Sequence, residues 1–174
     1  MFFKQYYLPC LSHASYMLGS EGNAIVIDPQ RDIDQYLEDA RSEGLSIKYV
    51  IETHLHADFV SGHAELAARA GAKIIIGENS QAKFMNQAVK DGDELKLGNL
   101  ELKFIATPGH TPESICILAT NTAQPEEAAK LFSGDTLFIG DVGRPDLVAT
   151  KDRTAAEMAG LLYESLHNKI MSYN

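Results

Sequence analysis

Residues 49–62, with the sequence YVIETHLHADFVSG, constrain the fold more than any other stretch of the chain. The first three residues are apolar and β-branched or aromatic, which predicts a short strand that runs into a core. The strand gives way to His54, His56 and Asp58. Side chains at i and i+2 of an extended backbone point to the same side, so the two imidazoles can converge on one point. A bend would bring Asp58 round to them.

The simplest interpretation of this stretch is a polar loop on the surface. Such a loop seldom contains two histidines and an aspartate directly after an apolar strand. Neutral imidazole and carboxylate are the donors that borderline divalent cations prefer. We therefore interpret the stretch as part of a metal site.

The composition predicts one globular domain over residues 1–174. The chain is 45% hydrophobic and 22% charged, with a formal net charge of −9. This negative balance argues against a nucleic-acid partner and against an anionic membrane surface. No apolar run approaches the length that spans a bilayer, and the first residues do not resemble a signal or transit peptide. With only two cysteines, Cys10 and Cys116, we expect a reducing, cytoplasmic environment.

Strands and helices are expected to be mixed along the chain. Strands are predicted at residues 2–8, 15–18, 23–27, 47–51, 73–77, 94–97, 100–106, 114–119 and 130–133. Helices are predicted at residues 33–40, 62–70 and 79–89 and after the capping box TAAE at residues 154–157. This order favours layered α/β (α+β) architecture over a simple doubly wound sheet. His13 is expected to be structural, and His63 is expected to face solvent.

Two further loops repeat the arrangement of the first. Each follows an apolar strand and places one possible ligand beside a glycine: His110 after Gly109, and Asp135 after Gly134. Glycine at such a place lets the backbone pass close to a metal. A single loop of this kind is usually just a turn, but three of them at strand ends together predict one shared site.

The motifs THLHAD, PGHTP and GDTLF, in this order, resemble the metallo-β-lactamase superfamily. The resemblance covers nearly the whole chain and implies an αββα sandwich with its metal site at one edge. Residues 54–62, together with GDVGRPDL at residues 140–147, are similar to the persulfide dioxygenases, which are also called sulfur dioxygenases. These are non-haem iron enzymes, and some carry a rhodanese domain after the catalytic one.

The resemblance implies that His54, His110 and Asp135 hold the metal and that His56 and Asp58 orient the ligands or bound water. Most hydrolases of the superfamily have a histidine where this chain has Phe59, and that histidine binds a second metal. Phe59 cannot bind a metal, so a single ion is favoured. Two imidazoles and one carboxylate leave coordination positions open, as in the non-haem Fe(II) oxygenases. One Fe(II) per chain is expected, with zinc as the alternative.

By resemblance, O₂ would oxidise the terminal sulfur of a small persulfide, and water would release sulfite and the free thiol. The expected substrate is glutathione persulfide. Arg144 is our candidate for binding it, because a guanidinium pairs well with a carboxylate.

Two other interpretations remain open from the sequence. The first is a two-metal thioester hydrolase of the glyoxalase II kind, that is, a hydroxyacylglutathione hydrolase. The second is a truncated, non-catalytic metal-binding fragment, because family members usually continue beyond the point where this chain stops. A homodimer and a rhodanese-type partner are possible associations in either case.

Overall fold

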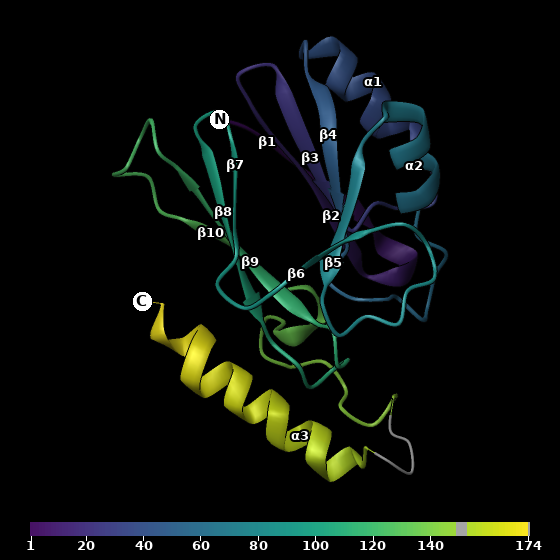
Figure 1. Ribbon diagram of the computed structural model, residues 1–174, viewed down its shortest axis with the longest axis vertical. Coiled ribbons are helices and arrows are strands. Elements are labelled where there is room, and N and C mark those ends of the chain that lie inside the picture. Colours follow the sequence, from purple (N-terminus) through teal and green to yellow (C-terminus); the bar gives the residue numbers. More distant parts are fainter. Residues whose placement is uncertain (149–152, 174) are drawn as a thin grey trace.

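The computed structural model describes residues 1–148 and 153–173, and it contains two β-sheets that face each other between helices (Figure 1). The strands of the larger sheet are β1 (Phe2–Leu8), β2 (His13–Ser20), β3 (Asn23–Ile27), β4 (Ser46–Ile51), β5 (Lys73–Gly77) and β6 (Gln87–Val89). The strands of the smaller sheet are β7 (Glu94–Leu97), β8 (Leu100–Ala106), β9 (Ile115–Asn121) and β10 (Lys130–Phe132). The helices are α1 (Asp34–Ser42), α2 (His63–Ala70) and α3 (Ala155–Glu164). Short helical turns are η1 (Pro9–Leu11), η2 (Gly134–Thr136), η3 (Ser165–Lys169) and η4 (Ile170–Ser172).

The larger sheet changes from antiparallel to parallel pairing at β3. Its strands follow one another in chain order, with β1, β2 and β3 antiparallel and β3 to β6 parallel. Parallel neighbours end at the same edge of a sheet. The polar residues that follow β3 and β4, Asp28 and Glu52, therefore lie side by side at that edge.

The smaller sheet is an antiparallel meander in the order β10-β9-β8-β7. Strand β8 ends just before the loop that carries His110, and β10 ends just before Asp135. Because β8 and β10 run in the same direction on either side of β9, their ends also meet at one edge. The chain thereby delivers three polar loops to one side of the molecule.

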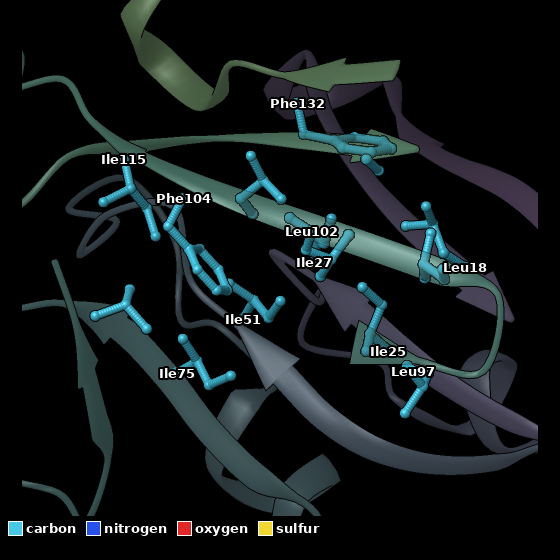
Figure 2. Packing of buried hydrophobic residues seen from close by; sticks show 14 residues of the cluster. Leu18, Ile25, Ile27, Ile51, Ile75, Leu97, Leu102, Phe104, Ile115 and Phe132 are labelled. Atoms are coloured by element: carbon cyan, nitrogen blue, oxygen red, sulfur yellow. The ribbon is translucent and has the colours of Figure 1, made fainter. Parts of the chain in front are cut away.

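The core lies between the two sheets (Figure 2). It is made of branched aliphatic and aromatic side chains from both inner faces, among them Ile51 at 0% exposure and Phe104 at 1%. Burial of such side chains is worth about 1.5–3 kcal/mol each. This packing fixes the strand ends, and with them the loops that follow.

Helices cover the two outer faces, which completes the αββα sandwich (Figure 1). Tyr36 of α1 and Leu66 of α2 are fully buried with Val50 against the larger sheet. On the smaller sheet, Ile170 packs with Ile105 and Cys116 beyond the end of α3. The predicted fold class is therefore confirmed. No helix of the described residues is long and apolar enough to cross a membrane.

The helix predicted at residues 79–89 is wrong. Residues 79–86 form turns and loop, and the stretch ends in the short strand β6. Val89 is the only residue of β6 that is buried, so the stretch has no apolar stripe that a helix could bury. Pairing of Gly77 with Val89 in the sheet satisfies the backbone instead.

The approach of α3 to the loop before His110 requires glycine. Gly109 has φ +149°, and a Cβ atom there would lie 2.4 Å from Cβ and 2.5 Å from Cα of Leu162. The Ser165 hydroxyl donates to the Pro108 carbonyl oxygen over 2.8 Å, which holds the helix and the loop together. The C-terminal helix thus sets the position of His110.

We expect Gly109→Ala to destabilise the protein by about 1–3 kcal/mol, because the added methyl group must push α3 and the His110 loop apart. Gly160→Ala, inside the same helix and with nothing within 4 Å of the added atom, is the matched control. It should stabilise the protein by about 0.5–1 kcal/mol. Urea unfolding measures both changes. Equal stabilities of the two variants would contradict the close contact.

Candidate metal centre

Asp28 and Thr53 orient His54. The Asp28 carboxylate accepts a hydrogen bond from the Thr53 backbone N–H and a second from the Thr53 hydroxyl, each over 2.7 Å. The hydroxyl oxygen of Thr53 also lies 3.1 Å from Nδ1 of His54. Because the hydroxyl proton is already donated to Asp28, Nδ1 of His54 must be the donor in this second hydrogen bond. The lone pair of Nε2 is then free to bind a metal.

A backbone carbonyl orients His110 in the same way. Nδ1 of His110 lies 3.1 Å from the carbonyl oxygen of Arg144, which can only accept a hydrogen bond. Nδ1 therefore carries the proton, and Nε2 is the free nitrogen. Both imidazoles are buried, at 2% exposure for His54 and 7% for His110.

The two free nitrogens face Asp135. Oδ2 of Asp135 is 3.8 Å from Nε2 of His54 and 3.5 Å from Nε2 of His110, and the three ligand atoms lie within 4.8 Å of one another. Burial, followed by the charge of His56, lowers the pKa of His54 to about 3, so this ring is neutral, as metal binding requires. Burial raises the pKa of Asp135, and a bound cation would favour its ionised form. These donors suit a divalent metal ion.

The glycine at residue 134 lets the Asp135 loop reach this place. Gly134 has φ +48°, and a Cβ atom there would lie 2.4 Å from Oγ1 of Thr53. The backbone of the Asp135 loop therefore packs closely against the side chain of Thr53, the residue before His54. Of the residues predicted to hold the metal, the structure brings all three together.

His56 directs its Nε2 toward two buried acids. Its Nε2 lies 3.3 Å from Oδ1 of Asp28 and 3.9 Å from Oε2 of Glu52. Burial opposes the charged form of His56, but the close approach and the negative charge of Asp28 outweigh burial and raise the pKa of His56 to about 9. Burial, and then the charge of Asp28, raise the pKa of Glu52 to about 8. Asp28, Glu52 and His56 form a second group whose ligand atoms lie within 4.8 Å of one another.

Phe59 packs against the rings of His56 and His13, with ring centroids 4.6 and 4.4 Å away. It therefore occupies space beside the metal loop without offering a donor atom. Asp58 is exposed and belongs to neither group of candidate ligands, although it lines the neighbouring cavity. The predicted orienting role of Asp58 stays a prediction.

A cavity of about 740 Å³ opens beside the triad. Asp135, Asp58 and His56 are among its polar lining residues, and much of the remaining wall is apolar, with Leu11, Phe132 and Phe138 among its members. The cavity reaches the triad at Asp135. It is large enough for a small organic ligand.

The prediction that His13 is merely structural is incomplete, because His13 lines this cavity. Its Nε2 lies 2.9 Å from the Asp28 carbonyl oxygen, so Nε2 donates and Nδ1 is left as an acceptor. The prediction that His63 faces solvent is wrong. Its side chain is 17% exposed, and Nδ1 lies 3.8 Å from Oε1 of Glu52.

The side chain of Arg144 lies in solvent. The guanidinium forms two hydrogen bonds with Asp146, of 3.1 and 2.6 Å, and the side chain is 68% exposed. Only the carbonyl oxygen of Arg144 touches the site, through His110. Binding of substrate by the guanidinium stays a prediction.

Sequence reasoning missed three buried acids of the site. Asp28 and Glu52 each follow an apolar strand directly, which is the same signal that marked His110 and Asp135. Glu113 accepts a hydrogen bond from the Leu55 backbone N–H over 3.0 Å and so fixes the metal loop. Of the three acids, only Asp28 and Glu52 could have been predicted from the sequence, because they directly follow apolar strands.

The fold and this site define the class of protein. A family model described as "Metallo-beta-lactamase superfamily" matches residues 8–122, and the chain belongs to that superfamily.

Relatives of this chain include a named hydrolase and a named dioxygenase. The hydroxyacylglutathione hydrolase of Polaromonas sp. is 41% identical over 125 residues, which is 70% of this chain and 45% of that protein. The human mitochondrial persulfide dioxygenase ETHE1 is 29% identical over 175 residues, which is 97% of this chain and 63% of that protein. The chain thus spans about half the length of the hydrolase and less than two thirds of the dioxygenase.

Two solved structures cover the whole chain. A metallo-beta-lactamase from Staphylococcus aureus subsp. aureus COL superposes with a TM-score of 0.90 at 40% identity, over 53% of its own chain. ETHE1 from Myxococcus xanthus superposes with a TM-score of 0.84 at 30% identity, over 72% of its own chain. The superfamily and its fold are therefore established for this chain.

We expect Thr53→Val to weaken metal binding about 10–100-fold, because it removes the hydroxyl that orients His54 while keeping the shape of the side chain. Thr53→Ser, which keeps the hydroxyl, should bind metal like the wild type. Competition with a chromophoric chelator measures both affinities. Unchanged affinity in the valine variant would show that the chain from Asp28 through Thr53 does not prepare His54.

Proposed function

We propose that this protein is a non-haem Fe(II) persulfide dioxygenase that oxidises a low-molecular-weight persulfide. The observation that carries the proposal is the single triad of His54, His110 and Asp135. Nε2 of His56 faces Asp28 instead, and Phe59 stands where most hydrolases of the superfamily have a further ligand. Two imidazoles and one carboxylate with open positions are the donor set of non-haem Fe(II) oxygenases. When bound, Fe(II) supplies the one-electron chemistry that ground-state O₂ requires.

The reaction balances as R–S–S⁻ + O₂ + H₂O → R–SH + HSO₃⁻. The terminal sulfur is oxidised, O₂ is reduced, and the sulfur–sulfur bond breaks when water adds. The chain's own contribution is positional: Thr53 and the Arg144 carbonyl hold the two imidazoles in the metal-binding tautomer. The apolar wall at Phe132 and Phe138 lies beside Asp135 and would limit water around the reacting sulfur.

Glutathione is the proposed thiol carrier, and Arg144 is its proposed contact. The likeness to ETHE1 and to hydroxyacylglutathione hydrolases supports a small thiol or thioester ligand. For the guanidinium to bind a substrate carboxylate, it must exchange its partner Asp146 for that carboxylate. Both side chains are exposed, so this exchange costs little.

A two-metal hydroxyacylglutathione hydrolase is the second candidate. Its support is the identity of 41% to a protein of that name, against 29% to human ETHE1. Against it stands Phe59, because a hydrocarbon ring cannot bind the second metal. A non-catalytic metal-binding role, a rhodanese-type partner, a homodimer and a cytoplasmic location stay predictions.

The proposal predicts that protein loaded anaerobically with Fe(II) consumes O₂ when glutathione persulfide is added and releases sulfite in equal amount. The variant His110→Ala, which removes one ligand, should lose both signals. An oxygen electrode and a sulfite assay measure them on the same sample. Hydrolysis of lactoylglutathione by the zinc-loaded protein, without sulfite from the iron-loaded one, would favour the hydrolase instead.

If Arg144 binds the carrier, Arg144→Ala should raise KM for glutathione persulfide about tenfold, or ~1.4 kcal/mol, and leave kcat nearly unchanged. Asp146→Ala frees the guanidinium and should lower KM. Steady-state kinetics of the Arg144→Ala and Asp146→Ala variants measure both KM values. Identical KM values in both variants and the wild type would exclude a contact with the guanidinium.

A further inference from the structure

The group formed by Asp28, Glu52 and His56 lies deeper than the triad. Asp28 and Glu52 are 3% and 1% exposed, and the His56 side chain is 5% exposed. The three residues come from the ends of β3 and β4 and from the loop that follows. The proposed reaction gives this group no direct part.

Two imidazole nitrogens that face this group have no hydrogen-bond partner among the described residues. They are Nε2 of His56 and Nδ1 of His63. Both face Glu52, at 3.9 and 3.8 Å, and Nε2 of His56 also lies 3.3 Å from Asp28. Buried polar groups in folded proteins nearly always have a partner, so an interior arrangement of this kind calls for a ligand.

The spacing in this group suits a shared cation better than direct hydrogen bonds. Hydrogen bonds between nitrogen and oxygen span about 2.7–3.2 Å. Two ligands about 2.1 Å from one tetrahedral ion lie roughly 3.4 Å apart. The distances of 3.3 to 3.9 Å here resemble the 3.5 and 3.8 Å within the triad of His54, His110 and Asp135.

The charges of the group favour a divalent ion. Asp28 and Glu52 form ion pairs with histidines, and with no lysine or arginine of residues 1–148 and 153–173. Two buried carboxyl groups whose charged partners are imidazoles alone keep an excess of negative charge when both are ionised, which is costly. A divalent cation would neutralise both at once.

The donor atoms are available, and an ion can reach them. Asp28 accepts one hydrogen bond on each oxygen, and Glu52 accepts one from Ser61 on Oε1, which leaves lone pairs on both carboxylates. Asp28 and His56 line the cavity of about 740 Å³, which provides the path of entry.

We propose that Asp28, Glu52 and His56 bind a second divalent cation of the zinc type, separate from the triad and independent of Asp58. Nδ1 of His63, 3.8 Å from Oε1 of Glu52, is a further donor. The ion would join the ends of β3 and β4 to the start of α2. Since Asp28 also accepts the hydroxyl proton of Thr53, the ion would support the orientation of His54.

Zinc binding to metal-free protein tests the proposal without any substrate, so the result is independent of persulfide or thioester turnover. The wild type should bind two equivalents of zinc per chain by calorimetry and by elemental analysis after desalting. His110→Ala should keep one equivalent, because only the triad is damaged. Adding Glu52→Gln to His110→Ala should abolish the remaining equivalent.

Asp58→Asn in the His110→Ala background is the matched control, because it changes a nearby carboxylate outside the proposed site. It should keep the equivalent. Glu52→Asp keeps the charge and withdraws the carboxylate by one methylene group, so it should weaken zinc binding at least tenfold. This variant also keeps the test valid if the glutamine variant misfolds. Circular dichroism checks folding of each protein.

Three results would overturn the proposal: one equivalent in the wild type, an equivalent that survives Glu52→Gln, or an equivalent lost with Asp58→Asn. One equivalent in the wild type would mean that protons shared between the side chains, and not a metal, stabilise Asp28, Glu52 and His56. The last would place a second ion beside the triad at Asp58.

Discussion

The site depends on the carboxylate and carbonyl of Asp28. The carboxylate binds the backbone and the hydroxyl of Thr53, and the carbonyl oxygen accepts from His13. Asp28 has φ +50°, a conformation that is uncommon for a residue other than glycine. Its backbone N–H donates to the Ile51 carbonyl oxygen over 2.9 Å, which holds this turn against the end of β4. One residue thereby holds the start of β2 at His13 and the segment from Ile51 to Thr53 in place.

The hydrophobic core makes this arrangement possible. Ile27 and Ile51 are fully buried and directly precede Asp28 and Glu52, so the strands deliver both acids to fixed places. Polar groups at this depth are tolerated when they are paired, and the network from Asp28 through Thr53 to His54 pairs them. Ligands at the ends of rigid strands are held more accurately than ligands on free loops.

Much of the fold and of the triad could be predicted from the sequence, because both rest on local patterns. The alternation of apolar runs gave most strands, and glycine beside His110 and Asp135 marked two of the ligands. The orientation of His56 could not be predicted, since it depends on Asp28, which is 28 residues away in sequence from His56 and adjacent only in the sheet. The strand β6 was missed for the same reason, because its pairing with β5 is a tertiary contact.

The contact between Gly109 and Leu162 gives the C-terminal helix a mechanical connection to the site. A displacement of α3 would act on the peptide bond next to His110, and the hydrogen bond from Ser165 to the Pro108 carbonyl oxygen would transmit it. A probe attached to the exposed face of α3, for example at Tyr163, would therefore report on the ligand loop from outside the molecule.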